Sequence, residues 1–322
     1  MNWHHSVVRD LYWAINSPSL IDTTELTHEL THELSPDFTT GLTHWQDFSD
    51  AFIHQLEQLD QHPAPLLNWL ASRLPPNRPP RLGLYFEALW HFYFDSHPKY
   101  QVVKHNLPIR TLNHQTLGEL DLIVKDLSRD CVMHIELAVK FYLALKWFFQ
   151  PMTSVGDNLE AYIGPGLKDR LIDKYLHTLN HQLPLSTSEE VLNLGIHIDE
   201  KHAIFKGRLF RPWHLSNDSH YRWLPEKDLH LLPADNRYRV LESTDWFAEK
   251  LIDTDISQLS LSAQLSAPLQ KPRQVAMFDP SQGRELTRYF IVPDQWEVSA
   301  EASFEALAQA AAKRSNNQRL SK

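Results

Sequence analysis

Two apolar stretches of this chain contain charged residues among side chains suited to a buried strand, and this pattern constrains the fold more than any other feature. In LGELDLIV (117–124), Glu119 and Asp121 are two residues apart; in HIELAVKFYL (134–143), Glu136 stands among apolar residues. Side chains alternate across a β-strand, so each stretch, as a strand, has an apolar face and an acidic face. Burying a carboxylate is costly without a partner, a metal ion or solvent. We therefore expect two strands whose acids share a site.

A helix is the alternative for the second stretch. There Glu136 and Lys140 would form an ordinary i,i+4 ion pair, and Leu, Ala, Glu and Lys are good helix formers. The period-two pattern and β-branched residues of 132–139, together with the similar pattern at 117–124, favour strands. If the strands are neighbours, Asp121 and Glu136 can bind one hard cation, and Lys140 shares the face of Glu136.

The composition indicates a chain that can bury a sizeable core. Its 322 residues are 42% hydrophobic, which argues against disorder, and the formal charge of -9 weighs mildly against a general nucleic-acid coat protein. The single cysteine, Cys131, excludes internal disulfides and CxxC zinc sites and suits a reducing cytoplasm. The sequence shows neither a signal-peptide pattern nor the roughly 18 apolar residues of a membrane helix. We expect a soluble cytoplasmic protein with no membrane partner.

Apolar spacing divides the chain into three regions. Residues 1–80 are expected to be helical, and they end in the proline-rich LPPNRPPR (74–81), which no helix can cross. Residues 81–211 form the predicted core. Residues 212–322 form a C-terminal extension with a hairpin around DPSQG and a final helix that ends in a basic tail. In the core we expect a helix at 82–94, strands at 100–110, 117–124 and 131–139, a helix at 166–183, and strands at 191–198 and 202–210.

Three of these stretches resemble known families. GLYFEALW, LGELDLIV and HIELAVKF resemble the PD-(D/E)XK nuclease superfamily, whose core is a helix, three strands, a helix and a strand. More closely, YFE, TLGELDL and ELAVKFYL are similar to an uncharacterised bacterial family, domain of unknown function number eighteen fifty-three, and this similarity includes GPGLKDRLIDKY and RYFIVPDQW. The resemblance implies an α/β fold with a restriction-endonuclease-like core (helix, three-stranded meander, helix, strand), a helical N-terminal region and a C-terminal extension.

The superfamily resemblance also implies which residues carry the chemistry. Asp121 matches the motif aspartate, Glu136 matches the acid of the following strand, and Glu87 matches a glutamate of the first helix. The superfamily's usual lysine lies two residues after the second acid. Here that position is Ala138, and Lys140 lies two residues further on the same strand face.

The implied function is metal-dependent hydrolysis of phosphodiester bonds in nucleic acid. Asp121 and Glu136 would hold Mg²⁺ (or Mn²⁺), with the Leu137 carbonyl as a third ligand, and Lys140 would orient a water or stabilise phosphate charge. The displaced lysine leaves an alternative open. A catalytically inactive protein that keeps the nuclease scaffold and binds nucleic acid or protein would show the same motifs, since a fold alone does not establish chemistry.

Two groups of basic residues are candidate contacts for nucleic acid. The first lies on the polar side of the helix expected at 166–183. The second lies in KHAIFKGRLFRPWHLS (201–216), which contains no acid. A solvated helix face and an exposed basic strand would explain the same residues without a nucleic acid. The candidates are Lys168, Arg170 and Lys174 in the first group and Lys206, Arg208 and Arg211 in the second.

The segment HELTH (28–32) matches the HExxH signature of zinc proteases, with His28 and His32 as the two ligands. It arises inside the period-four repeat TELTHELTHEL, and SPDF follows in place of a GxxH extension. We expect a capping or loop segment there instead of a zinc site.

Overall fold

The computed structural model describes residues 3–21, 42–146, 159–214, 221–251, 260–265 and 268–320, with side chains to residue 313. The HELTH segment lies outside these residues. The described residues form a mixed α/β structure that divides into two compact units. Unit 1 comprises Met1–Lys140 and Tyr175–Gly207, and unit 2 comprises Phe141–Lys174 and Arg208–Lys322. All the acids singled out in the sequence belong to unit 1.

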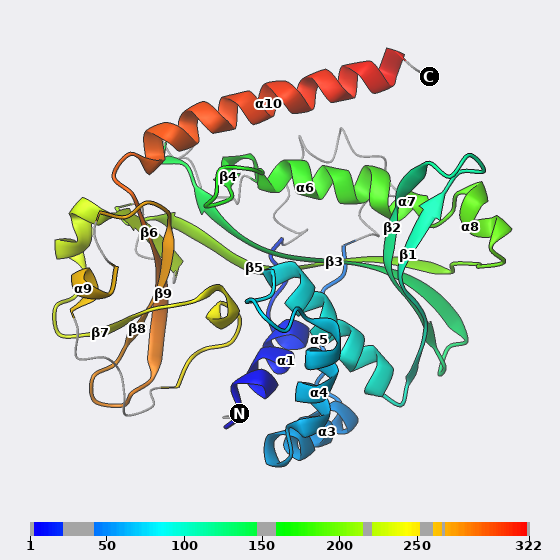
Figure 1. Cartoon of the computed structure of the whole chain (residues 1–322), viewed down its shortest axis with the longest axis horizontal. Coiled ribbons are helices and arrows are strands. Elements are labelled where there is room, and N and C mark those ends of the chain that lie inside the picture. Colours follow the sequence, from blue (N-terminus) through cyan, green and yellow to red (C-terminus); the bar gives the residue numbers. More distant parts are fainter. Residues whose placement is uncertain are drawn as a thin grey trace. The chain divides into compact units, whose positions relative to one another are not determined.

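A group of helices forms the N-terminal part of unit 1 (Figure 1). Its members contact one another in the order α1–α3–α4–α5, and α1 also contacts α5. Ser49 caps α3 by accepting a hydrogen bond at its side chain from Phe52 N–H, so this helix begins at Asp50. The helices are α1 (Ser6–Asn16), α3 (Asp50–Gln61), α4 (Ala64–Arg73) and α5 (Leu82–Ser96).

The strands of unit 1 confirm the predicted meander. β1 (Tyr100–Arg110), β2 (Thr116–Asp126) and β3 (Cys131–Ala144) pair as antiparallel neighbours, and β5 (Glu200–Pro212) lies next to β3. β3 is buried along almost its whole length, as expected of a central strand covered on both faces. The helical alternative for residues 134–143 is therefore wrong.

Gly207 permits the close approach of β5 to β3. Its φ is +146°, which disfavours any residue with a side chain, and a Cβ at this position would lie 1.7 Å from the Lys140 carbonyl oxygen. No side chain fits in that space.

N-terminal residues line β5 within unit 1. Leu20 N–H donates to the Phe205 carbonyl at 2.7 Å, and Thr43 N–H donates to the Ala203 carbonyl at 3.0 Å. Leu42 also forms a parallel bridge with Ala203. Backbone groups of β5 thus find partners in two segments far away in sequence.

The connection from β3 to β5 contains helical turns of different kinds. The helix predicted at 166–183 is confirmed in part: α6 covers Leu171–His177, a π-helical turn, η5, covers Thr178–Gln182, and α7 covers Leu183–Leu185. The strand predicted at 191–198 is wrong, because α8 (Glu189–Asn193) occupies its start. The Ser188 side chain caps this helix by accepting a hydrogen bond from Val191 N–H, and acidic residues follow in its first turn, a combination that favours a helix N-terminus.

Unit 2 contains the predicted C-terminal hairpin and the predicted final helix. β8 and β9 are its antiparallel arms, and the strand order that starts from β5 is β5-β6-β9-β8-β7, with β4 paired to β3. The remaining elements are β4 (Tyr162–Ile163), β6 (Tyr221–Pro225), β7 (Arg237–Val240), β8 (Arg273–Phe278), β9 (Glu285–Val292), the 3-10 turns η4 (Leu159–Ala161), η6 (Glu226–Leu231) and η7 (Ser243–Asp245), and the helices α9 (Leu261–Leu265) and α10 (Trp296–Leu320).

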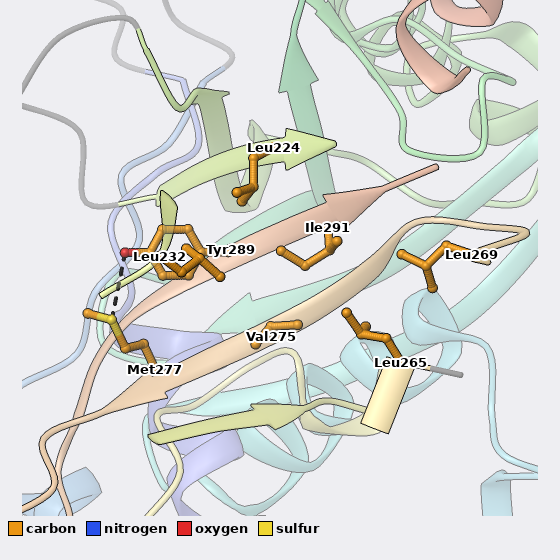
Figure 2. Packing of buried hydrophobic residues seen from close by; sticks show 8 residues of the cluster. All are labelled: Leu224, Leu232, Leu265, Leu269, Val275, Met277, Tyr289 and Ile291. Atoms are coloured by element: carbon orange, nitrogen blue, oxygen red, sulfur yellow. Dashed lines mark hydrogen bonds between the residues drawn. The ribbon is translucent and has the colours of Figure 1, made fainter. Parts of the chain in front are cut away.

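One apolar cluster in the core of unit 2 joins residues of strands, of α9 and of loops (Figure 2). Met277 of β8 is unusual in this cluster, because its sulfur faces the hydroxyl groups of Tyr289 at 3.8 Å and Tyr238 at 3.4 Å. The cluster therefore contains polar contacts to sulfur as well as apolar packing. Its members are Leu224, Leu232, Leu265, Leu269, Val275, Met277, Tyr289 and Ile291.

Candidate functional site

Asp121 lies where β2 separates from β3. The backbone register of these strands runs as far as the Leu122–Ile135 pair, and Asp121 is the next residue of β2. Its Oδ2 accepts a hydrogen bond from Leu137 N–H at 2.9 Å. The Asp121 side chain therefore replaces the backbone hydrogen bonds of the ladder at this point. Asp121 lies beside Glu136, as expected if the two strands are neighbours.

On the other side of Asp121, β1 is irregular at Asn106. This residue has a φ of +45°, a left-handed conformation that Asn adopts more readily than most residues. Its neighbours on β1 pair with Leu120 and Leu122, so the irregularity faces Asp121. Asn106 Nδ2 donates to Glu119 Oε1 at 3.1 Å, which holds this exposed acid near the same place.

Glu87 of α5 contributes a further carboxyl group. Burial raises the pKa of Glu87 to about 7, and the negative charges of Asp121 and Glu119 add to this effect. The charge of Glu136 also raises the pKa of Glu87, whereas a hydrogen bond with Asn106 lowers it. Four acids from one helix and two strands thus interact electrostatically, and Glu87 is near its midpoint of protonation at neutral pH.

His91 links α5 to the Asp121 backbone. It lies four residues after Glu87, and therefore on the same helix face, and it hydrogen-bonds the backbone of Asp121. Burial, with the nearby His105, lowers the pKa of His91 to about 3, so the ring is neutral at physiological pH. α5 therefore positions both a carboxyl group and the strand opposite it.

Glu136 is held inside unit 1 by two side chains. It is 3% exposed, and its Oε1 lies 2.8 Å from His134 Nε2, while its Oε2 accepts a hydrogen bond from Gln182 Nε2. Thr178 Oγ1 donates in turn to Gln182 Oε1 at 2.8 Å. Burial lowers the pKa of His134 to about 4. The neutral ring therefore donates a hydrogen bond from its Nε2–H group to Glu136 Oε1.

The structure brings the predicted acids together. Glu87, Asp121 and Glu136 lie in one electrostatic cluster of unit 1. Lys140 is half-buried, four residues beyond Glu136 on β3. Leu137, the predicted carbonyl ligand, contributes its N–H to Asp121.

Lys206 and Arg208 are both buried, unlike the exposed side chains that either a nucleic-acid contact or an exposed basic strand requires. Lys206 is 1% exposed, and its Nζ donates to the carbonyls of Ile15 at 3.1 Å, of Trp45 at 2.8 Å and of Ser17. Burial also lowers the pKa of Lys206 to about 7. In unit 2, Arg208 is buried and donates to backbone carbonyls at 2.5 and 2.6 Å. Neither cation lies at the surface, where a phosphate would bind it.

The remaining basic candidates differ in exposure. Arg170 is buried and donates two hydrogen bonds to Asp173, at 2.8 and 2.6 Å. Lys174 and Arg211 are half-buried, and Lys168 is exposed. Of the six candidates, Lys168 is the one at an exposed position.

Some residues of the site have no signal in the predicted pattern. Gln182 was missed because its contact with Glu136 depends on the π turn, and Asn106 was missed because its left-handed backbone interrupts a regular strand. His134 is on the same strand face as Glu136, so the alternation of side chains is enough to predict that the two lie close together.

The acids do not form a ready-made cage for a metal ion. Across the described ranges, no three His, Cys, Asp or Glu side chains are grouped so that they could hold one. A magnesium site can consist of two carboxylates with water molecules as the other ligands, so it does not require a group of three such side chains. Hard carboxylate oxygens are the donors that Mg²⁺ prefers. The donor set of Asp121 and Glu136 therefore fits Mg²⁺ in its chemistry.

Comparison with known proteins places the chain in a family. A family model described as Domain of unknown function (DUF1853) matches residues 9–292. The chain belongs to this family. The DUF1853 match includes the whole acidic cluster in unit 1 and the β8–β9 hairpin in unit 2. No curated protein and no solved structure matches the chain. Among the helices that the structure describes, none has the length and apolar character needed to cross a membrane.

Proposed function

We propose that this DUF1853 protein is a metal-dependent phosphodiesterase that hydrolyses nucleic acid, with its centre at Asp121 and Glu136. The observation that carries the proposal is the convergence of Glu87, Asp121, Glu119 and Glu136. Burial first, and then the neighbouring negative charges, raise the pKa of Glu87 to about 7. Carboxylates that repel one another are stabilised by a divalent cation bound between them. The resemblance of the same residues to the PD-(D/E)XK motifs supports the choice of reaction.

Each residue would have a distinct role. Asp121 and Glu136 would hold Mg²⁺ or Mn²⁺, and the bound ion would lower the pKa of a water and neutralise the leaving oxygen. Glu87 has a pKa suited to accepting a proton from water near pH 7. Lys140, on the same strand as Glu136, would orient the water or offset phosphate charge.

One observation favours the second candidate, a catalytically inactive protein that uses the same scaffold to bind nucleic acid or protein. Both Glu136 oxygens accept hydrogen bonds, and the residue is 3% exposed. A carboxylate in this setting can serve the structure alone. The buried positions of Lys206, Arg208 and Arg170 also leave fewer basic groups for a phosphate backbone.

The deciding experiment measures Mn²⁺ binding by calorimetry and cleavage of single- and double-stranded DNA and RNA on the same protein samples. Asp121→Asn removes a charge while keeping the side-chain size. Asp95→Asn is the matched control, because Asp95 is an exposed acid on α5. We expect wild type and the control to bind Mn²⁺ and to cut, and Asp121→Asn to lose both properties.

The other outcomes are equally clear. Mn²⁺ binding without cleavage of any substrate would support the inactive scaffold. Folded wild-type protein that neither binds Mn²⁺ nor cuts would overturn the proposed metal centre. Cleavage that Asp121→Asn retains would place the activity elsewhere in the chain.

A further inference from the structure

A chain of hydrogen bonds connects the π turn to the candidate metal ligand Glu136. Thr178 Oγ1 donates to Gln182 Oε1 at 2.8 Å, and Gln182 Nε2 donates to Glu136 Oε2. Thr178 and Gln182 are the first and last residues of η5. The turn therefore brings both side chains to the same acid through consecutive contacts.

Thr178 fixes the orientation of the Gln182 amide. An amide group has a donor end and an acceptor end, and rotation by half a turn would direct its oxygen at the Glu136 carboxylate. Because the Thr178 hydroxyl donates to the amide oxygen, the amide nitrogen is left facing Glu136. Thr178 is 1% exposed, so water does not compete for this hydroxyl.

His134 holds the other carboxylate oxygen. Its ring is fully buried, and among the described residues its Nδ1 has no hydrogen-bond partner. The one hydrogen bond found for this ring joins Nε2 to Glu136 Oε1. The Glu136 carboxylate is thus fixed at one oxygen from its own strand and at the other from the π turn.

We propose that Gln182 and Thr178, together with His134, are positioning residues that hold the Glu136 carboxylate in the orientation needed for cation binding. This inference rests on the proposed function. π turns interrupt helices at an energetic cost and are found frequently at functional sites. Groups that hydrogen-bond a metal ligand commonly change metal affinity or activity by roughly 10- to 100-fold when they are removed.

The test compares Thr178→Val with Thr178→Ser in the full chain. Valine keeps the shape of threonine and removes the hydroxyl, whereas serine keeps the hydroxyl. Gln182→Ala tests the second link. Thr187→Val is the control, because Thr187 is an exposed threonine two residues after α7. The readouts are the Mn²⁺ dissociation constant by calorimetry and, where cleavage occurs, kcat and KM separately.

For Thr178→Val and Gln182→Ala we expect Mn²⁺ binding roughly 10-fold weaker or more, with KM for nucleic acid unchanged. Thr178→Ser and Thr187→Val should match wild type. If the first two variants fold and bind Mn²⁺ as wild type does, the positioning role is wrong while the proposed function stands. If wild type itself binds no Mn²⁺, both proposals fail. Circular dichroism confirms that each variant is folded, and in the variants that keep Gln182 its side-chain amide signals in NMR report on its contact with Glu136.

Discussion

Leu137 N–H donates to Asp121 Oδ2 at 2.9 Å, one residue beyond the last backbone pair of β2 and β3. This contact joins the side chain of one candidate ligand to the backbone beside the other, Glu136. Shortening Asp121 would therefore change the strand separation as well as remove a candidate ligand. Substitution with Asn, which keeps the side-chain length, is for this reason the informative change at position 121.

Gly207→Ala should destabilise the protein by about 3 kcal/mol, because the new Cβ would meet the Lys140 carbonyl and the positive φ would strain the backbone. The measurement is urea denaturation at pH 7. Gly166→Ala is the control, since a Cβ there meets nothing within 4 Å. Equal stability of the two variants would mean that β5 does not approach β3 in this way.

Lys206→Met should cost about 3 kcal/mol of unfolding free energy, because it leaves the carbonyls of Ile15, Ser17 and Trp45 without their shared donor. Lys201→Met on the same strand is the control, since Lys201 makes one hydrogen bond, to the exposed Thr187. A Lys206→Met variant that is as stable as wild type but binds nucleic acid more weakly would restore the nucleic-acid role predicted from the sequence.

Glu87→Gln should change how stability depends on pH. The folded-state pKa of Glu87 is about 7, above the ordinary 4.5, so the folded state keeps this proton where the unfolded state has lost it. Wild type should therefore lose stability, relative to Glu87→Gln, as pH rises from about 4.5 to about 7, and the difference should be constant above that range. Denaturation curves at pH 4.5, 5.5, 6.5 and 8 test this. A pH-independent difference would contradict the raised pKa.

Arg288→Met should destabilise unit 2 by roughly 3–5 kcal/mol, because it leaves Glu285 buried without its cation. Arg288 is 0% exposed, and it contacts Glu285 at 2.5 and 3.1 Å. The double variant Glu285→Gln/Arg288→Met should recover part of the loss, whereas Arg284→Met, at an exposed position, should be nearly neutral. The measurement is thermal unfolding followed by calorimetry. A double variant that is no more stable than Arg288→Met would contradict this role of the ion pair.

The strands could be predicted because burial on a sheet has a period of two, and residues 117–124 and 131–139 show that period clearly. The same alternation placed Asp121 and Glu136 on the acidic faces of their strands, and the predicted meander made those strands neighbours. Lys206 could not be placed in the same way, because a basic residue in a strand looks the same in sequence whether its ammonium faces water or a set of carbonyls. Only the tertiary structure supplies those acceptors.

The π turn did leave a signal. Leu171, Tyr175, Leu179 and Leu183 are all buried and are all spaced by four. On an α-helix of 3.6 residues per turn, each step of four rotates the next side chain by about 40° away from the last. A wider turn within η5 reduces that drift and keeps the apolar residues in line. Strict four-residue spacing therefore favours an interrupted helix, which the amphipathic pattern alone did not distinguish.

The contacts of Leu20 and Thr43 with β5 have a consequence for truncated forms of the protein. A strand edge with unpaired backbone N–H and C=O groups can pair with a strand of another chain, and an exposed edge of this kind promotes self-association. A chain that lacked its first 47 residues would lose the partners of the Ala203 and Phe205 carbonyls, and with them the carbonyls that bind Lys206. We therefore expect that removal of the N-terminal segments would expose β5 to pairing with a strand of another copy of the chain.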